Sequence, residues 1–160
     1  MKGYYIGGIQ QIGIGVTNLR EAWKWYIEQF GMDCRIFEEE AVAKLMLPYT
    51  GGKPRSRHAV LAINMQSGGG FEIWQYVERK PLSPKFEVRM GDLGIFAAKI
   101  KCRNIRSTFD FLKSQGAEML SGILRDPRGK EHFFIKDLYG NIFQIVTSIT
   151  WFRNEKKPTG

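Results

Sequence analysis

The chain has 160 residues, of which 43% are hydrophobic and 13% aromatic, a composition that excludes a disordered chain and allows one sizeable core or two small packed modules. Its net charge is +8, but neither basic cluster, "GGKPRSRH" or "FRNEKKPTG", comes with a docking element or stacking aromatics, so we expect no nucleic-acid partner. No run approaches the ~20 apolar residues of a membrane span, and the N-terminus lacks a signal-peptide pattern. We therefore expect a cytoplasmic protein without a membrane partner, whose charge favours anionic ligands.

The first predicted elements are a strand and a helix. The stretch "QIGIGV", which begins at Gln11, alternates like a strand. From Leu19 to Phe30 the apolar residues recur at helical spacing. Asn18, with a glutamate three residues later, resembles a capping box, and Gly31 is suited to end the helix.

The rest of the first half predicts three further strands. "DCRIFEEE" and "RHAVLAINM" are intermediate strands, and "GGFEIWQ" is the last strand. Between the intermediate strands, residues 39–57 contain two prolines and two glycines and predict a loop. We expect Gly68 to Gly70 to supply the positive φ angles of a turn before the last strand.

The second half repeats the first. Asn104 begins the same helical pattern, which ends at Gly116, and "EHFFIKDL" and "GNIFQIV" predict strands, with Gly140 in the turn between them. We predict an α+β fold of two tandem βαβββ modules, whose strands form a curled, cup-shaped mixed sheet. The predicted boundaries are residues 1–80 for the first module, 81–94 for a linker, 95–150 for the second module and 151–160 for a C-terminal tail.

Strand alternation predicts which side chains face the cup. In the first strand the apolar set from Ile12 to Val16 belongs under the helix, which leaves Gln11 on the other face. Glu72 is the least ordinary of the cup residues: it is either an edge-strand carboxylate in water or a group that binds a metal, acts as a base or holds a cation. The side chains predicted to face the cup are Gln11, Glu72, Trp74, Tyr76, Ala97, Lys99 and Gln144.

Three stretches together resemble the vicinal oxygen chelate superfamily: "QIGIGVTNLREAWKWYIEQFGM", "GGFEIWQY" and "DLYGNIFQIV". This superfamily includes glyoxalase I, methylmalonyl-CoA epimerase, extradiol dioxygenases, fosfomycin-resistance enzymes and bleomycin-binding proteins. The resemblance extends from about Ile9 to Ile149. It implies the two-module fold, a small-molecule ligand and a homodimer, whereas the activity varies among superfamily members.

The resemblance also bears on a metal. In the metal-dependent members, four residues converge on one divalent cation, and their positions here hold Gln11, Glu72, Ala97 and Gln144. Alanine has no donor atom, and Gln144 stands where glutamate is usual. The remaining donors Gln11, Glu72 and Gln144 imply either no cofactor or a weakly bound divalent metal, which would be Zn, Ni, Mn or Fe. We expect His58 and His132 to be surface or hydrogen-bonded side chains rather than ligands.

Two functions remain open. One is a glyoxalase-like or epimerase-like lyase or isomerase, in which Glu72 is the base and a metal or Lys99 stabilises the enediolate. Lys99 either approaches Glu72 in place of the ion or extends from the rim into solvent. For this function the ligand is a small anionic or carbonyl-containing molecule. The alternative is a metal-free protein of the bleomycin-resistance type, which sequesters an aromatic or anionic small molecule, such as a drug, in a pocket lined by Trp74, Tyr76 and Ala97.

Overall fold

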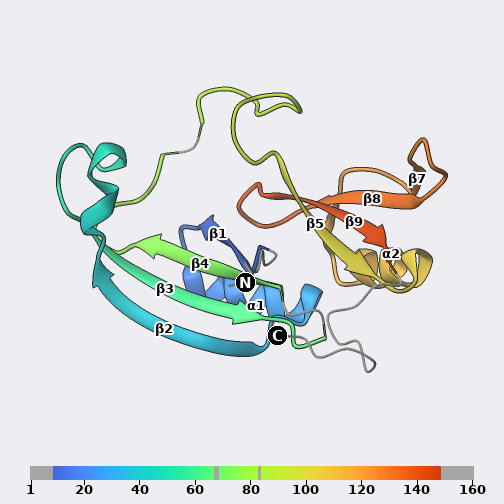
Figure 1. The fold of residues 1–160 in the computed structure, drawn as a ribbon, viewed down its shortest axis with the longest axis horizontal. Helices are drawn as coiled ribbons and strands as arrows, with labels where there is room; N and C mark the ends of the chain where they lie inside the picture. Colours follow the sequence, from blue (N-terminus) through green and yellow to red (C-terminus); the bar gives the residue numbers. More distant parts are fainter. Residues whose placement is uncertain (1–8, 67–68, 83, 149–160) are drawn as a thin grey trace, which may run out of the picture. The chain divides into compact units, whose positions relative to one another are not determined.

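In the computed structural model, residues 9–66, 69–82 and 84–148 are described, and the chain divides between Pro81 and Leu82 into two compact units. We call the described part up to Pro81 unit 1 and the described part from Leu82 to Ser148 unit 2 (Figure 1). The predicted tail 151–160 lies outside the described residues. Within the described part of the chain, no helix combines the length and the hydropathy needed to cross a membrane.

Unit 1 has the predicted order of strand, helix and three strands. Its sheet has four strands in the order β1-β4-β3-β2, with β1 parallel to β4 and the other neighbours antiparallel (Figure 1). A 3₁₀ helix, η1, is inserted between β2 and β3. The elements are β1 (Gln11–Gly15), α1 (Leu19–Phe30), β2 (Cys34–Val42), η1 (Lys44–Tyr49), β3 (Ser56–Ile63) and β4 (Gly70–Tyr76).

The ends and the buried side of α1 follow from the sequence. The Asn18 side chain accepts a hydrogen bond from the backbone N–H of Glu21 at 3.2 Å, and Gly31 ends the helix in the left-handed conformation at φ 63°. On the buried side, the ring of Tyr26 meets that of Phe71 on β4, with their centroids 5.1 Å apart. Burial of these aromatic rings supplies much of the unit 1 core.

Unit 2 repeats this arrangement. Its five-stranded sheet has the order β5-β9-β8-β6, and the short β7 pairs with β8. Asn104 caps its helix by accepting from the N–H of Ser107 at 3.0 Å, and Phe133 and Phe143 are buried in the core. The elements are β5 (Ala97–Cys102), α2 (Ile105–Ser114), β6 (Glu118–Met119), β7 (Leu124–Arg125), β8 (Glu131–Lys136) and β9 (Ile142–Thr147). The predicted α+β fold of two βαβββ modules is confirmed, with β7 as an addition.

Two local predictions need correction. The predicted loop 39–57 is partly regular, because β2 continues to Val42 and η1 follows. Neither Gly69 nor Gly70 has a positive φ angle, and Gly68 lies outside the described residues. Gly70 is needed for a different reason: a Cβ atom there would lie 2.4 Å from the carbonyl oxygen of Ala62 on β3. The turn glycine Gly140, in contrast, has the predicted positive φ, 90°.

Candidate functional site

The strand register places the predicted unit 1 residues on one face of its sheet. Glu72 on β4 lies opposite Gly13 of β1 and Leu61 of β3. Neighbours across paired strands share a face, and Phe71 and Ile73, which alternate with Glu72, are buried on the α1 side. Glu72, Trp74 and Tyr76 therefore point away from α1, together with Gln11.

Gln11 and Glu72 are brought into direct contact. The side-chain amide Nε2 of Gln11 donates a hydrogen bond to Oε2 of Glu72 at 2.8 Å. Two glycines of β1, Gly13 and Gly15, leave space for the indole of Trp74. Cβ atoms at these positions would lie 3.6 Å and 3.4 Å from the indole. The indole thus rests against the bare backbone of β1, and this contact fixes one wall of the site.

Arg57 is a site residue that the sequence reasoning missed. Its Nη1 lies 3.8 Å from Oε1 of Glu72, and its Nη2 donates to Oε1 of Glu39 at 2.8 Å. Arg57 pairs across the sheet with Tyr76, so its guanidinium reaches Glu72 only because the side chain extends along the sheet. The signal was present in the alternation of Arg57, Ala59 and Leu61 on β3, which share one face, although it takes the register to show which face this is.

These side chains surround a cavity of about 220 Å³. Trp74 and Tyr76 form an edge-to-face pair, with ring centroids 5.2 Å apart and an interplanar angle of 85°. η1 contributes Met46, so one wall comes from the segment that was expected to be an irregular loop. The lining residues are Ala43, Met46, Arg57, Glu72, Trp74 and Tyr76. The cavity therefore combines apolar walls with one oppositely charged pair.

The remaining predicted residues belong to unit 2. Lys99 on β5 lies opposite Gln144 on β9, and Ala97 lies opposite Ile142. All three predicted residues alternate with residues packed on the α2 side, such as Phe143, so they occupy the face opposite α2. Lys99 is exposed there, whereas Gln144 and Ala97 are half-buried. The approach of Lys99 to Glu72, the role of Gln144 as a ligand and the place of Ala97 in the pocket stay predictions.

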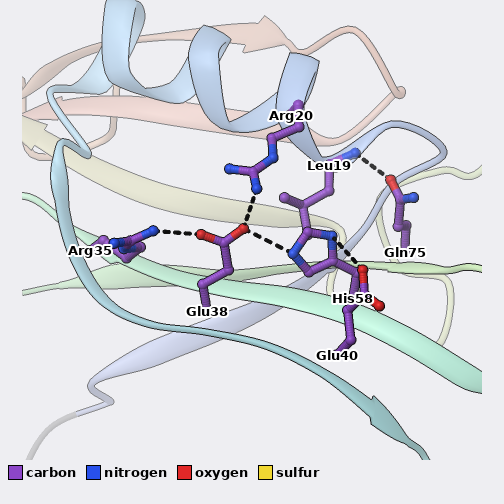
Figure 2. Close-up of polar contacts among 7 residues, drawn as sticks. All are labelled: Leu19, Arg20, Arg35, Glu38, Glu40, His58 and Gln75. Carbon is purple, nitrogen blue, oxygen red and sulfur yellow. Dashed lines mark hydrogen bonds and ion pairs between the residues drawn. The ribbon is translucent and has the colours of Figure 1, made fainter.

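His58 belongs to a polar cluster on the opposite face of the unit 1 sheet (Figure 2). Its Nε2 lies 3.0 Å from Oε1 of Glu38, which also pairs with Arg20 of α1 at 2.5 Å and, through Oε2, with Arg35 at 2.6 Å. Burial acts to raise the pKa of Glu38, but hydrogen bonds from Arg35 and His58 and the charges of Arg20 and Arg35 hold it below its ordinary value. This cluster attaches α1 to the sheet, and it gives His58 a structural role.

The donor chemistry of unit 1 does not fit a tightly held divalent metal. Gln11 and Glu72 offer one neutral amide and one carboxylate, and within residues 9–66, 69–82 and 84–148 no group of three His, Cys, Asp or Glu side chains is placed to hold an ion. The Arg57 guanidinium stands 3.8 Å from the single carboxylate. A divalent cation about 4 Å from that guanidinium would meet a repulsion of roughly 8 kcal/mol at an effective dielectric constant of about 20.

Comparison with known proteins identifies the family. The chain belongs to the Glyoxalase/Bleomycin resistance protein/Dioxygenase superfamily, whose family model matches residues 8–145. This match confirms the resemblance found in the sequence. A search of curated proteins found no match.

Solved structures show the same fold. A glyoxalase family protein from Bacillus cereus has a TM-score of 0.71 at 12% identity, covering 94% of this chain and 99% of its own. A glyoxalase family protein from Enterococcus faecalis has a TM-score of 0.64 at 19% identity, covering 87% and 96%. The fosfomycin resistance protein FosX from Listeria monocytogenes has a TM-score of 0.57 at 13% identity, covering 90% and 95%. At such identities the likeness establishes the fold alone.

Proposed function

We propose that this protein binds a small carbonyl-containing molecule in the unit 1 cavity, as a binding protein without chemistry of its own. The observation that carries the proposal is the lining of the cavity, where the Trp74–Tyr76 pair and Met46 surround the Arg57–Glu72 pair. Aromatic and thioether walls favour a flat apolar body, and a few polar groups fix its orientation.

The contacts of Glu72 favour binding over proton transfer. One carboxylate oxygen accepts from Gln11 at 2.8 Å, and the other faces Arg57 at 3.8 Å. A general base must place a free oxygen within hydrogen-bond reach of the proton that it removes. Here Oε2 already accepts from Gln11, and a ligand proton that approached Oε1 would lie beside the positive charge of Arg57, whereas a bound ligand can use the pair as it stands.

The proposal is tested by screening uncharged aromatic ketones and amides against the purified protein by thermal shift and ligand-observed NMR. We expect at least one to bind, and Trp74→Phe to weaken the binding, because a smaller ring leaves the wall over Gly13 and Gly15 incomplete. Trp23→Phe is the matched control, since Trp23 lies on α1 and donates to the carbonyl of Met32. Equal weakening by both substitutions, or the absence of any binding, would contradict the proposal.

A lyase or isomerase is the second candidate, supported by the 28% exposure of the Glu72 side chain within the cavity lining. In this case Glu72 removes a proton from the carbon next to the ligand carbonyl, and the proposed role of Lys99 is to stabilise the resulting enolate. The test is incubation in D₂O with 2-acetylnaphthalene, followed by NMR of its methyl protons. Exchange that disappears in Glu72→Gln supports the enzyme, and exchange no faster than in buffer supports the binder.

Further parts of the proposal concern the biological setting. The family description includes bleomycin resistance, and one similar structure is a fosfomycin resistance protein, which supports drug sequestration as the purpose of binding. We place the protein in the cytoplasm as a homodimer. Size-exclusion chromatography with light scattering measures the oligomeric state, and a monomer at micromolar concentration would contradict the dimer.

A further inference from the structure

A fixed cation already stands beside the carboxylate of the cavity. The guanidinium of Arg57 is anchored by Glu39, whose Oε1 accepts from Nη2 at 2.8 Å. Arg57 is also held by its place in β3, opposite Tyr76. A guanidinium is always charged and presents several N–H donors in a fixed plane. The protein itself therefore supplies a positive charge 3.8 Å from the carboxylate that a metal would have to bind.

We infer that the Arg57–Glu72 pair, rather than a metal ion, holds the ligand, and that it selects an uncharged molecule with a carbonyl oxygen next to an N–H or O–H group. This inference rests on the proposed function, because it names the class of ligand for the same cavity. The ligand carbonyl accepts from the guanidinium, and the adjacent N–H or O–H donates to the carboxylate.

The spacing between Arg57 and Glu72 leaves each of the two groups able to form a further hydrogen bond. Nη1 of Arg57 and Oε1 of Glu72 are 3.8 Å apart, which is longer than a hydrogen bond. Nη1 is buried and has no hydrogen-bond partner among the described residues. An unpartnered buried donor is costly, so the site gains from a ligand that supplies an acceptor.

The charge of the cavity differs from that of the whole chain. The net charge of the chain is +8, but the charged residues that line the cavity are Arg57 and Glu72, whose charges cancel. An anionic ligand would be attracted by Arg57 and repelled by Glu72. A cationic ligand would be attracted by Glu72 and repelled by Arg57. Since neither sign of charge is favoured, the expectation of an anionic ligand does not extend to this cavity.

The test compares three molecules of nearly the same shape: 2-naphthamide, which is uncharged, 2-naphthoate, which is anionic, and 2-naphthamidinium, which is cationic. Their dissociation constants are measured by ligand-observed NMR on the wild-type protein. We expect 2-naphthamide to bind at least about tenfold more tightly than either charged molecule, because each of those leaves one group of the pair without its complement.

Two substitutions should reverse this preference in opposite directions. Arg57→Gln leaves Glu72 unopposed and should make 2-naphthamidinium the tightest of the three. Glu72→Gln leaves Arg57 as the one charged residue of the cavity lining, with Glu39 paired behind it, and should make 2-naphthoate the tightest. A merely structural role of either residue would weaken all three molecules together and would not reorder them. Arg20→Gln, on the α1 side of the same sheet, is the matched control and should keep the wild-type order; circular dichroism confirms that each variant is folded.

The statement that no metal ion holds the ligand is tested on the same samples. Dialysis against EDTA should leave the three dissociation constants unchanged, and calorimetry with Ni²⁺, Zn²⁺ and Mn²⁺ should show no stoichiometric binding. Binding of 2-naphthamide that EDTA abolishes and a metal restores would overturn the inference, as would one order of preference in all variants. Failure of all three molecules to bind would overturn the proposed function as well, whereas equal binding of the three would overturn the inference alone.

Discussion

Gly70 stands at the start of β4, where the neighbouring strand leaves no room for a side chain. A Cβ atom there would lie 2.4 Å from both the carbonyl oxygen of Ala62 and Cγ2 of Ile63. The backbone oxygen belongs to a paired strand and cannot rotate away as a flexible side chain can. The absence of a side chain at this position is therefore a condition for closing β3 onto β4, the strand that carries Glu72 and Trp74.

We predict that Gly70→Ala lowers the free energy of unfolding by about 1–3 kcal/mol, the usual cost of overpacking. Gly69→Ala is the control, because a Cβ atom at Gly69 meets nothing within 4 Å. Urea unfolding followed by circular dichroism measures both. Equal stability of Gly70→Ala and the wild type would show that the two strands can separate without loss.

At the scale of single residues, the sequence predicted which face of the sheet some side chains occupy and missed the roles of others, for physical reasons. Alternation within one strand is enough to set Glu72 and Trp74 apart from Phe71 and Ile73, because the buried set is apolar. It could not assign Arg57, since β3 is apolar on both faces near its centre and only pairing with β4 orients it. The role of Gly70 was also hidden, because the clash that it avoids involves a carbonyl from another strand.

The attachment of α1 to its sheet depends on a buried apolar side and a polar edge. At this edge, Glu38 of β2 meets Arg20, Arg35 and His58 (Figure 2). Near the helix start, the backbone N–H of Leu19 donates to Oε1 of Gln75 at 2.5 Å. These contacts join α1 directly to β2 and β4, and Glu38 in turn joins it to His58 of β3.

The Glu38 cluster predicts a pH dependence of stability. The pKa of Glu38 is lower in the folded protein than the ordinary 4.5. The ionised carboxylate therefore contributes fully to the free energy of unfolding above about pH 4.5, and this contribution is lost as the pH falls through the lower pKa of the folded state. We expect Glu38→Gln to lower the free energy of unfolding by roughly 1 kcal/mol at pH 7, with the difference shrinking below pH 4.5. Urea titrations at pH 7, 5 and 3 measure it.

The control for this experiment is Glu28→Gln, which removes a carboxylate with 49% exposure that pairs with Lys24 at 3.8 Å. Such an exposed pair contributes about 0.3–0.5 kcal/mol, so the substitution should have a small effect. A Glu38→Gln difference that persists unchanged at pH 3 would mean that packing rather than charge holds the cluster together.

Elements were predicted well where short-range rules decide them. Both helices begin at a capping asparagine and have an apolar stripe, so Asn18 and Asn104 mark their starts correctly. η1 was missed because Pro48 and the glycines beyond it indicate a loop, and a short 3₁₀ helix has no apolar stripe of its own. Since η1 supplies Met46 to the cavity, the same omission concealed part of the site.

At the scale of the whole molecule, each unit has its own helix, sheet and core. Phe133 of unit 2 is fully buried and packs edge to face on Phe109, with ring centroids 5.1 Å apart. The sequence predicts the modules 1–80 and 95–150 as parts of one structural domain, and we predict in addition that each of them opens separately. Local cores of this kind commonly open as distinct cooperative units.

We predict that Phe133→Ala costs about 3–5 kcal/mol and that the loss of protection appears first in α2, β8 and β9. Hydrogen exchange with mass spectrometry should show β3 and β4 of unit 1 less affected. Phe111→Ala is the matched control, since this α2 side chain is 46% exposed and its removal should change little. A uniform loss of protection along the chain would indicate one cooperative body.

The two modules use the same register for different side chains. Gly13 pairs with Glu72 in unit 1, and at the equivalent position Lys99 pairs with Gln144 in unit 2. A repeated scaffold can carry different side chains at equivalent positions, because the backbone of each module is specified by its own helix and sheet. Libraries aimed at new ligands can therefore be randomised on the β5 and β9 surface, because the strands of unit 2 are held by their own register and core.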